Sequence, residues 1–459
     1  MPGPPRAWAL IALASAGACL DIPPYLPCGE ADRDCDGWPA MAGAPAARDC
    51  DDTNAVVNPA AVDDPATAVI EDCFAEALTT PLAPVTAEAR GWSVADVVLE
   101  FDSTTRMPSS LRFSNVELLG SNTDPCVRDE RAAGISLYPA FGVDDQSVQV
   151  GQIATVRGGP ALATSRVTWS QAVPMAATGF GCDAATTITG AIDFTVQPNG
   201  RVVRSDEVTV SAGVSTCAGC ANATGTAPIF TSYWTFAPSF DRYRVQPAPT
   251  SSVFPGAGMP AIDLPAPGAP TAGCISGANT SLPRVGVAWS FPTPIAGMRA
   301  RTTNDGRVNH AMVVDWVNSS AVAAGTHRLV SALAPALGGG GECPDALLRA
   351  MEEFTVPPTL TPTDFVATRG VYRYTGDEGA GITITATQGV EGGAVIEVPN
   401  ASERGLTVWR GTGGSYVRLR RGRDYLLQLD ADRTGVIYLP AIVAGTTLVV
   451  AGPGGEPPA

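Results

Sequence analysis

Short alternating runs of apolar and polar residues recur along the chain beyond residue 90. The runs are rich in Val, Ile, Thr and aromatic residues and are bounded by Gly, Pro, Asn and Asp, a pattern typical of β-strands joined by tight turns. Only Asp345–Phe354 has the spacing of a helix, with Asp345 as its expected N-terminal cap. Strands are predicted at Val94–Phe101, Val148–Arg157, Ser165–Trp169, Ile188–Val196, Arg201–Ser211, Phe230–Phe236, Gly286–Phe291, Met298–Thr303, Val308–Trp316 and His327–Ala332.

Many short strands without intervening helices predict an all-β protein with two or three β-sandwich domains of the Ig-like kind. Hairpin turns are expected at Pro198-Asn199-Gly200 and Asn304-Asp305-Gly306. The segment from Arg423 to Val450 resembles the last strands of small Ig-like modules on bacterial and phage surface proteins. The expected division is a β-sandwich over 90–245, a Pro-rich linker over 246–272, a second β-rich domain over 273–360 and a C-terminal Ig-like domain over 361–452.

The first residues have the pattern of an export signal. Ala7–Ala18 is an unbroken apolar and small run after one Arg, and it is shorter than the ~20 residues of a membrane-spanning helix. The stretch from Ser15 to Cys19 resembles the lipobox of bacterial lipoproteins, although Ala16 stands where that family usually carries Leu. We therefore expect a signal peptide over 1–18 and a secreted or surface protein, lipid-anchored if Cys19 is modified. Cleavage after Ala16 or Ala18 without a lipid is the alternative.

Cysteine usage agrees with export. Apart from Cys19, ten Cys remain, and an even number suits disulfides in an oxidising compartment. The Cys-Ala-Gly-Cys stretch has the spacing of a redox or zinc motif, but no second such motif and no nearby His accompany it, so a structural disulfide is expected there. The expected pairs are Cys28–Cys35, Cys50–Cys73 and Cys217–Cys220.

Acidic residues are concentrated near the N-terminus, in an expected tether over residues 19–85. The net charge is −16, and −13 of it lies between Asp21 and Glu100, where sixteen acidic residues accompany three Arg. Anionic charge argues against binding to a nucleic-acid backbone. A local cluster of carboxylates indicates instead a site for a hard cation.

Two groups of Asp residues supply the candidate ligands. In Asp32-Arg33-Asp34-Cys35-Asp36-Gly37 the carboxylates alternate, and the closing Gly permits the sharp turn that gathers them on one ion. The twelfth position of an EF-hand loop supplies a bidentate Glu, but here it is Gly43, so further ligands must come from elsewhere. We expect one Ca²⁺ bound by Asp32, Asp34, Asp36, the backbone carbonyl of Trp38, Asp49, Asp51 and Asp52.

Residues 28–75 as a whole resemble the MopE-type metal-binding motif of secreted bacterial proteins and are similar to the calcium loops of thrombospondin type 3 repeats. The resemblance rests on DxDxDG, on DCDDxNxxxNPxA and on the acidic pair before Cys73. Cys35 and Ala60 replace Gly residues of the motif, and its closing DNDCDG is absent. The resemblance implies a divalent metal, calcium most often, with copper as the alternative. Calcium is favoured because all candidate ligands are oxygens; a solvated acidic linker that binds nothing is the other interpretation.

No catalytic motif is evident. The only His residues are His310 and His327, and period-two geometry places His310 and Asp315 on opposite faces of a strand, so a structural role is expected for His310. Six Arg between Arg404 and Arg423 accompany Trp and Tyr, a composition that suits anionic glycans or lipid headgroups, with a solvated hairpin face as the alternative.

The sequence therefore predicts a non-enzymatic, secreted or surface-anchored protein with a calcium-binding N-terminal motif and a structural or adhesive role. Its expected partners are a cell-surface component or a glycan, without nucleic acid, and with membrane contact only through an N-terminal lipid. The alternatives are a secreted carbohydrate-binding protein and a glycoside hydrolase with two carboxylates in residues 90–250, about 5–9.5 Å apart.

Overall fold

The computed structural model describes an almost entirely β protein with one short helix. Within the described part of the chain, no helix is long and apolar enough to cross a membrane. The described ranges are 32–40, 48–120, 133–137, 149–173, 186–215, 230–264, 271–290, 297–302, 309–315, 321–337 and 343–452, without 65–66, 68, 77, 104–105, 212–213, 249, 323, 378–381 and 402–404.

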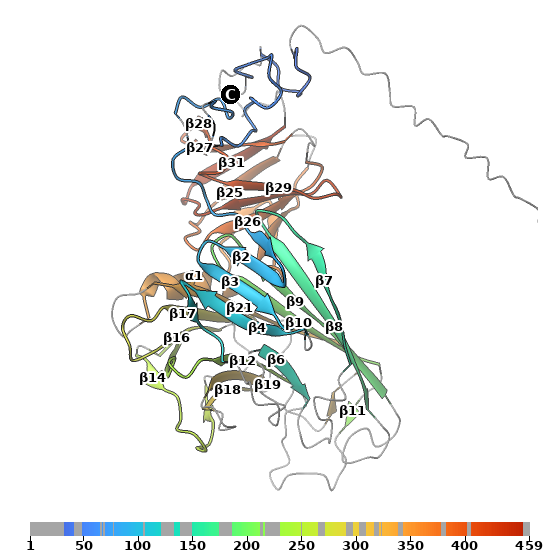
Figure 1. Ribbon diagram of the computed structural model, residues 1–459, viewed down its shortest axis with the longest axis vertical. Coiled ribbons are helices and arrows are strands. Elements are labelled where there is room, and N and C mark those ends of the chain that lie inside the picture. The colour runs from blue at the N-terminus through green and yellow to red at the C-terminus, as the bar shows by residue number, and fades with distance from the viewer. Residues whose placement is uncertain are drawn as a thin grey trace, which may run out of the picture.

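A nine-stranded antiparallel sheet forms the centre of the main body (Figure 1). Its apolar side chains face a second layer of strands, and together the two layers bury one continuous core that includes Phe194, Trp234 and Trp289. In sheet order the strands are β14 (Ser252–Val253), β13 (Arg242–Val245), β16 (Thr271–Ser276), β17 (Arg284–Ser290), β21 (Gly325–Ala336), β10 (Val202–Val210), β9 (Thr186–Val196), β8 (Ala163–Val173) and β7 (Gln149–Arg157).

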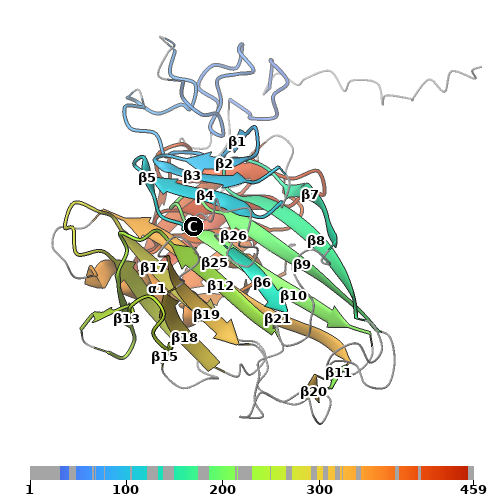
Figure 2. The same ribbon diagram turned by 60° about the horizontal axis from the view of Figure 1, so that its bottom comes forward.

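Two five-stranded sheets make up the second layer (Figure 2). A bridge between Leu119 and Phe236 joins them, so they cover neighbouring parts of the nine-stranded sheet. The first contains β1 (Thr86–Glu88), β2 (Gly91–Val94), β3 (Val97–Phe101), β4 (Pro108–Phe113) and β5 (Val116–Glu117). The second contains β15 (Ile262–Asp263), β18 (Gly297–Thr302), β19 (His310–Asp315), β12 (Phe230–Phe236) and β6 (Ala133–Leu137), and β11 (Val214–Ser215) pairs with β20 (Ala321–Val322) outside both.

This sheet order corrects the expected division at residues 246–272. Strands β16, β17 and β21 come from the expected second domain, yet they pair in one sheet with β10 and β13 from the expected first. The Pro-rich segment between them contributes β14 and β15, which are short and lie at sheet edges, where Pro and short strands are tolerated. Residues 90–245 and 273–360 therefore build one interleaved body.

Local strand predictions agree better with the structure. Phe230–Phe236 is β12, and Pro198-Asn199-Gly200 turns between β9 and β10 with Gly200 at φ 77°. Val94–Phe101 is divided into two strands, because Ala95 adopts φ 47° and turns the chain. The hairpin expected at 304–306 lies outside the described residues.

The single helix, α1 (Asp345–Thr355), packs on the outer face of the nine-stranded sheet. Its apolar stripe contacts Ala and Val side chains of β16, β17 and β21, and the disulfide Cys274–Cys343 fixes its beginning to β16. The predicted cap was wrong: Pro344 occupies the cap position without a side-chain hydrogen bond, and Asp345 is the first helical residue. The buried stripe consists of Leu347, Leu348, Met351 and Phe354.

A separate C-terminal sandwich follows, and both of its sheets contribute to one core. All pairs are antiparallel except β24 with β26, and its Ig-like character stays a prediction. One sheet contains β22 (Leu360–Thr361), β25 (Ile382–Ala386), β31 (Thr446–Ala451), β27 (Thr407–Thr412) and β28 (Ser415–Arg418). The other contains β23 (Thr363–Val366), β24 (Val371–Tyr374), β26 (Ala394–Val398), β30 (Gly435–Leu439) and β29 (Leu426–Leu429).

Charged residues cross the junction between the main body and the C-terminal sandwich. Glu397 of β26 is 3% exposed and lies 2.5 Å from Arg157 of β7, 2.9 Å from Arg369 and 3.5 Å from Arg373. Gln428 accepts a hydrogen bond from the backbone of Leu162. The two bodies therefore meet through a specific, largely desolvated polar network rather than through a flexible linker.

Candidate metal centre

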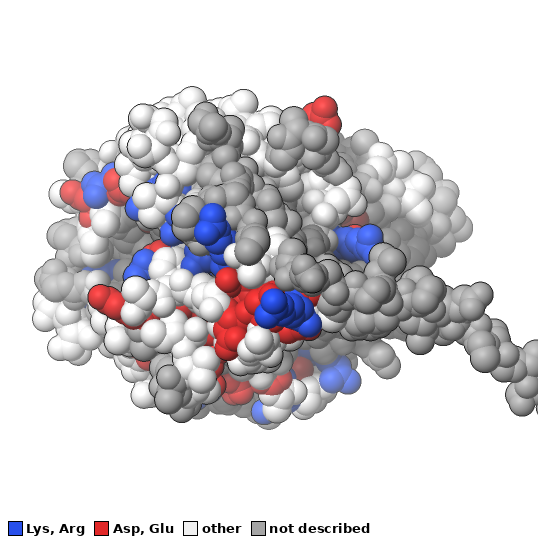
Figure 3. Space-filling model, turned by 90° about the horizontal axis from the view of Figure 1, so that it is seen from above, with Lys and Arg blue, Asp and Glu red and all other residues white. Residues whose placement is uncertain are grey.

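The acidic segment lies on the end of the C-terminal sandwich, beside β27 and β28 (Figure 1). In the view onto that end, acidic side chains gather in one patch with Arg side chains beside it (Figure 3). The contact is specific, because Arg421 donates a hydrogen bond to the carbonyl of Ala60 and Leu82 donates through its backbone to Gly422. The described part of the segment is docked on the sandwich and does not form the free tether that the charge pattern suggested.

The first acidic loop is shaped by hydrogen bonds from its own backbone. Gly37 donates to Asp32 at 3.1 Å, Asp36 to Asp34 at 3.3 Å and Trp38 to Asp36 at 2.7 Å. Left-handed conformations at Cys35, φ 68°, and at Gly37, φ 90°, make the turns that these contacts require. Each carboxylate is thus held in place by one of its two oxygens.

The other oxygen of each carboxylate has no partner within the described structure. Asp49 follows the same pattern, since its Oδ1 accepts from the backbone of Asp51 at 2.9 Å while its Oδ2 is unpartnered. Asp49 is only 6% exposed, and buried carboxylate oxygens are normally hydrogen-bonded or bound to a cation. The unpartnered buried oxygens are Asp32 Oδ1, Asp34 Oδ2, Asp36 Oδ2 and Asp49 Oδ2.

These carboxylates are close enough to share an ion. Ligand oxygens of Asp34, Asp36 and Asp49 lie within 4.8 Å of one another, and so do those of Asp32, Asp34 and Asp52. Burial, reinforced by the negative charges of Asp36, Asp34 and Asp52, raises the pKa of Asp49 to about 6. Burial and the charge of Asp34 also raise the pKa of Asp36. The ion-free cluster thus disfavours its own ionised form, which is the electrostatic condition that a cation relieves.

The structure separates the predicted ligands into two classes. Asp51 belongs to neither carboxylate group, and its Oδ1 accepts from the backbone and hydroxyl of Thr53. Asp52 joins the cluster at its exposed side, where it also accepts from the backbone of Arg33 at 2.9 Å. The indole of Trp38 is fully buried, and the expected role of its carbonyl stays a prediction.

Disulfides reinforce this segment. Cys50 and Cys73 are joined, as expected from the sequence, and Cys35 is also disulfide-bonded. Asp49, Cys50 and Cys73 form a further compact group, but the sulfurs are consumed by the disulfide and offer no thiolate. Four predicted sites lie outside the described residues: the lipidation site Cys19, and the disulfide partners Cys28, Cys217 and Cys220.

Sequence reasoning missed the contact that holds the segment in place. Arg420 is 2% exposed and pairs with Asp72 at 2.5 Å and with Asp63 at 3.1 Å, and both carboxylates are also buried. The ring of Phe74 lies 4.3 Å from the guanidinium of Arg418. Local patterns gave no signal, since Asp72 and Arg420 are 348 positions apart.

The basic stretch before residue 423 is therefore only partly a surface. Arg418 and Arg420 are buried against the acidic segment and Arg421 is half-buried, whereas Arg410 and Arg423 are exposed. This corrects both expectations for the stretch, the solvated hairpin face and the glycan- or lipid-binding surface, for the residues nearest the acidic segment.

His310 has the structural role that its isolation in the sequence suggested. It is buried, its Nδ1 lies 3.0 Å from the Thr302 hydroxyl, and its ring stacks on Phe254 at 4.8 Å. Burial lowers the pKa of His310 despite the opposing charge of Asp241. The neutral ring is thus the form that the fold favours.

The depressed pKa of His310 predicts a pH dependence of stability. Below the ordinary pKa of about 6.5, the unfolded chain takes up a proton before the folded chain does, so acid favours unfolding. We expect the free energy of unfolding to fall more steeply between about pH 7 and pH 5 in the native protein than in His310→Gln. Urea unfolding at both pH values measures the difference, and equal slopes would contradict it.

Comparisons with known proteins leave the family open. No family model and no curated protein matches the chain. Weak structural similarity exists to a proposed aldose 1-epimerase from Escherichia coli K12, with 8% identity, TM-score 0.32 and coverage of 56% of this chain and 99% of that one. A heparan sulfate lyase from Pedobacter heparinus gives 8% identity and TM-score 0.29 over 67% of this chain and 41% of that one. A galactose 1-epimerase from Lactobacillus acidophilus gives 7% identity and TM-score 0.29 over 56% of this chain and 100% of that one.

All three are carbohydrate-active enzymes by name. Scores this low establish neither a shared fold nor a shared activity, and they lend no support to a non-enzymatic assignment either.

Proposed function

We propose that this chain is a calcium-binding structural or adhesive protein of the cell exterior, without enzymatic activity. One observation carries the calcium part: four buried carboxylate oxygens, from two overlapping groups that share Asp34, lack a hydrogen-bond partner while their sister oxygens are fixed by the backbone. Such an arrangement is preorganised for a cation. Bound calcium would complete the surface that the acidic segment presents beside the C-terminal sandwich.

The donor set favours calcium over copper. In both groups of Asp residues, every candidate ligand atom is a carboxylate oxygen. Oxygen is a hard ligand that suits Ca²⁺, whereas Cu²⁺ and Zn²⁺ prefer nitrogen or thiolate. The nearest sulfurs are tied in the Cys50–Cys73 disulfide. Each group offers three carboxylates and no bidentate Glu of the EF-hand kind, which fits the modest affinity of extracellular calcium modules, ~10⁻⁴–10⁻³ M.

Calcium titration of the full chain tests this function. We expect a binding isotherm in the millimolar to submillimolar range, and a stabilisation of about 2.7 kcal/mol when free calcium exceeds Kd a hundredfold. The double variant Asp34→Asn and Asp49→Asn should abolish both effects, because it removes the carboxylate that the two groups share and the most buried one.

Asp51→Asn is the matched control. Its side chain lies two residues from Asp49, but it caps Thr53 through an oxygen that Asn retains, so calcium affinity should be unchanged. Tight copper uptake without a calcium isotherm would replace calcium with copper. Absence of binding by either ion would leave the segment as a docked, disulfide-tied surface without a metal.

A further inference from the structure

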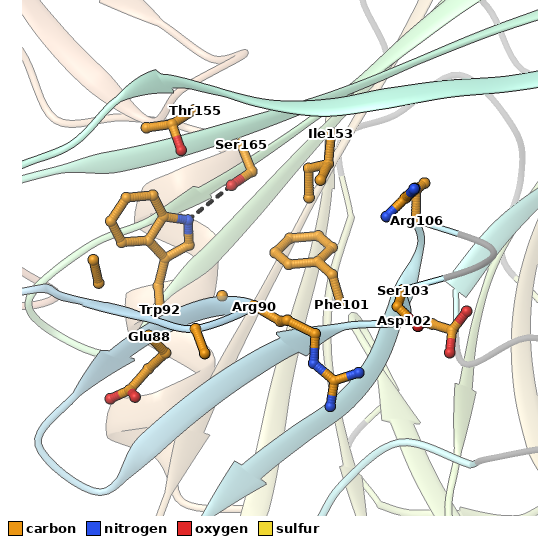
Figure 4. Close-up of a pocket in the computed structure, with 13 residues that line it drawn as sticks. Glu88, Arg90, Trp92, Phe101, Asp102, Ser103, Arg106, Ile153, Thr155 and Ser165 are labelled. Carbon is orange, nitrogen blue, oxygen red and sulfur yellow. Dashed lines mark hydrogen bonds between the residues drawn. The ribbon is translucent and has the colours of Figure 1, made fainter.

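A concavity opens between β2 and β3 on one side and the edge strand β7 with its neighbour β8 on the other (Figure 4). Its volume is about 290 Å³, at the lower limit of the ~300–1,000 Å³ typical of ligand pockets. None of the candidate calcium ligands lines it. A pocket of this size accommodates one ring-sized unit rather than a peptide segment.

Two aromatic side chains form its rigid base. Trp92 projects from β2 and donates from Nε1 to the Ser165 hydroxyl of β8 at 2.8 Å, which fixes the indole between the two sheets (Figure 4). Phe101 of β3 packs edge-on against Phe194 with ring centroids 5.5 Å apart. The base is therefore preorganised, and since Trp92 and Phe101 are only 6% and 3% exposed, a small apolar part of each ring reaches the pocket.

Two arginines at this pocket have unused binding capacity. Arg90 and Arg106 both line it, and within the described chain neither guanidinium has a hydrogen-bond or ion-pair partner. Arg106 adopts φ 61°, a conformation that costs a non-Gly residue energy, and its backbone donates to the Asp102 carbonyl at 3.0 Å. Backbone strain of this kind concentrates at ligand sites, and planar guanidinium groups match carboxylates.

The other residues that line the pocket restrict the kind of ligand that it can bind. Glu88, which accepts from the Ser93 hydroxyl at 2.6 Å, and Asp102 also border the pocket, and Ser103 and Thr155 add hydroxyls. Acidic side chains accept hydrogen bonds from ligand hydroxyls but repel a compact dianion such as phosphate. A ligand that combines a single carboxylate, several hydroxyls and a ring with an apolar face satisfies all of these groups.

We propose that this pocket binds one carboxylated sugar unit, as the end of an acidic glycan or as a free sugar acid. The carboxylate pairs with Arg106 and Arg90, the ring rests on the small apolar surface that Trp92 and Phe101 present, and the hydroxyls bond to Ser103 and Thr155. Through this pocket the protein would adhere to a surface that carries such sugars. The pocket is independent of the calcium centre.

Calorimetric titration of the full chain with methyl glucuronide, against neutral methyl glucoside, tests the proposal. We expect the glucuronide to bind and the glucoside to bind at least about tenfold more weakly, because charge-assisted hydrogen bonds are lost. Arg106→Gln and Arg90→Gln should each weaken glucuronide binding by a similar factor. Arg112→Gln is the control: Arg112 lies on β4, pairs with Glu100 at 3.2 Å and does not line the pocket.

Titration with a disaccharide that has a terminal glucuronate shows whether the natural ligand is the end of a glycan or a free sugar acid. Binding tighter than that of methyl glucuronide assigns the pocket to glycan ends, and weaker binding assigns it to free sugar acids; both support the proposed chemistry. Equal affinity for glucuronide and glucoside, binding of neither, or unchanged affinity in both Arg variants would overturn it. The Asp34→Asn, Asp49→Asn variant should bind glucuronide normally, so failure at the calcium centre is recognised separately.

Discussion

Replacing Arg420 with Met should lower the free energy of unfolding by about 3–5 kcal/mol, the largest effect we expect from a single substitution. Arg420 is buried with the carboxylates of Asp63 and Asp72, so its loss removes the only guanidinium in the described structure that is paired directly with these two desolvated negative charges. Met retains much of the aliphatic stem that packs near Phe74, which separates the electrostatic effect from a packing defect. Urea unfolding measures the change.

The same substitution should weaken calcium binding, because Asp72 precedes Cys73, and Cys73 is bonded to Cys50 beside Asp49. Arg423→Met is the matched control: Arg423 is exposed and pairs only with the neighbouring Asp424, so its removal should cost less than about 1 kcal/mol. Equal stability of the two variants would show that the acidic segment is not held by Arg420.

Replacing Glu397 with Gln should cost about 2–4 kcal/mol and uncouple the C-terminal sandwich from the main body. The buried carboxylate lies between Arg157, Arg369 and Arg373, and Gln preserves its shape but not its charge. Arg369 and Arg373 are partly exposed, which is why the expected loss is below that for Arg420. Calorimetry should show one melting transition in the native protein and two in the variant.

Glu391→Gln provides the comparison. Glu391 pairs with Arg349 at 3.3 Å, but both side chains are more than half exposed, so a loss within about 1 kcal/mol is expected. A single unchanged transition in Glu397→Gln would mean that the remaining contacts, Arg157 with Asp430 at 2.9 Å and the apolar packing of Leu162 and Val395, suffice to join the two bodies.

The sequence predicted what is decided locally. The alternating carboxylates Asp32, Asp34 and Asp36 lie in one short loop, and their spacing with a Gly turn places Asp34 in a group with each of the other two. Asp51 was assigned to the same site from its proximity in sequence, whereas in the structure it joins neither carboxylate group and its Oδ1 accepts from Thr53.

Long-range pairing was beyond local patterns. Composition marked 246–272 as a linker, but β10 pairs with β21 across that segment, and strand partners depend on the whole core rather than on the intervening chain. The pocket between β2 and β7 likewise exists only because two sheets meet. Its two arginines carried no motif that sequence alone could single out.

The docking of the acidic segment sets an order on folding. Ala60 and Asp72 bind to Arg421 and Arg420, which follow them by 361 and 348 residues. Closing such a long loop is slow compared with forming local hairpins. The segment that leaves the ribosome early therefore has to wait for nearly the whole chain before its contacts exist. During that interval its carboxylates stay hydrated, and its cysteines remain accessible to solvent.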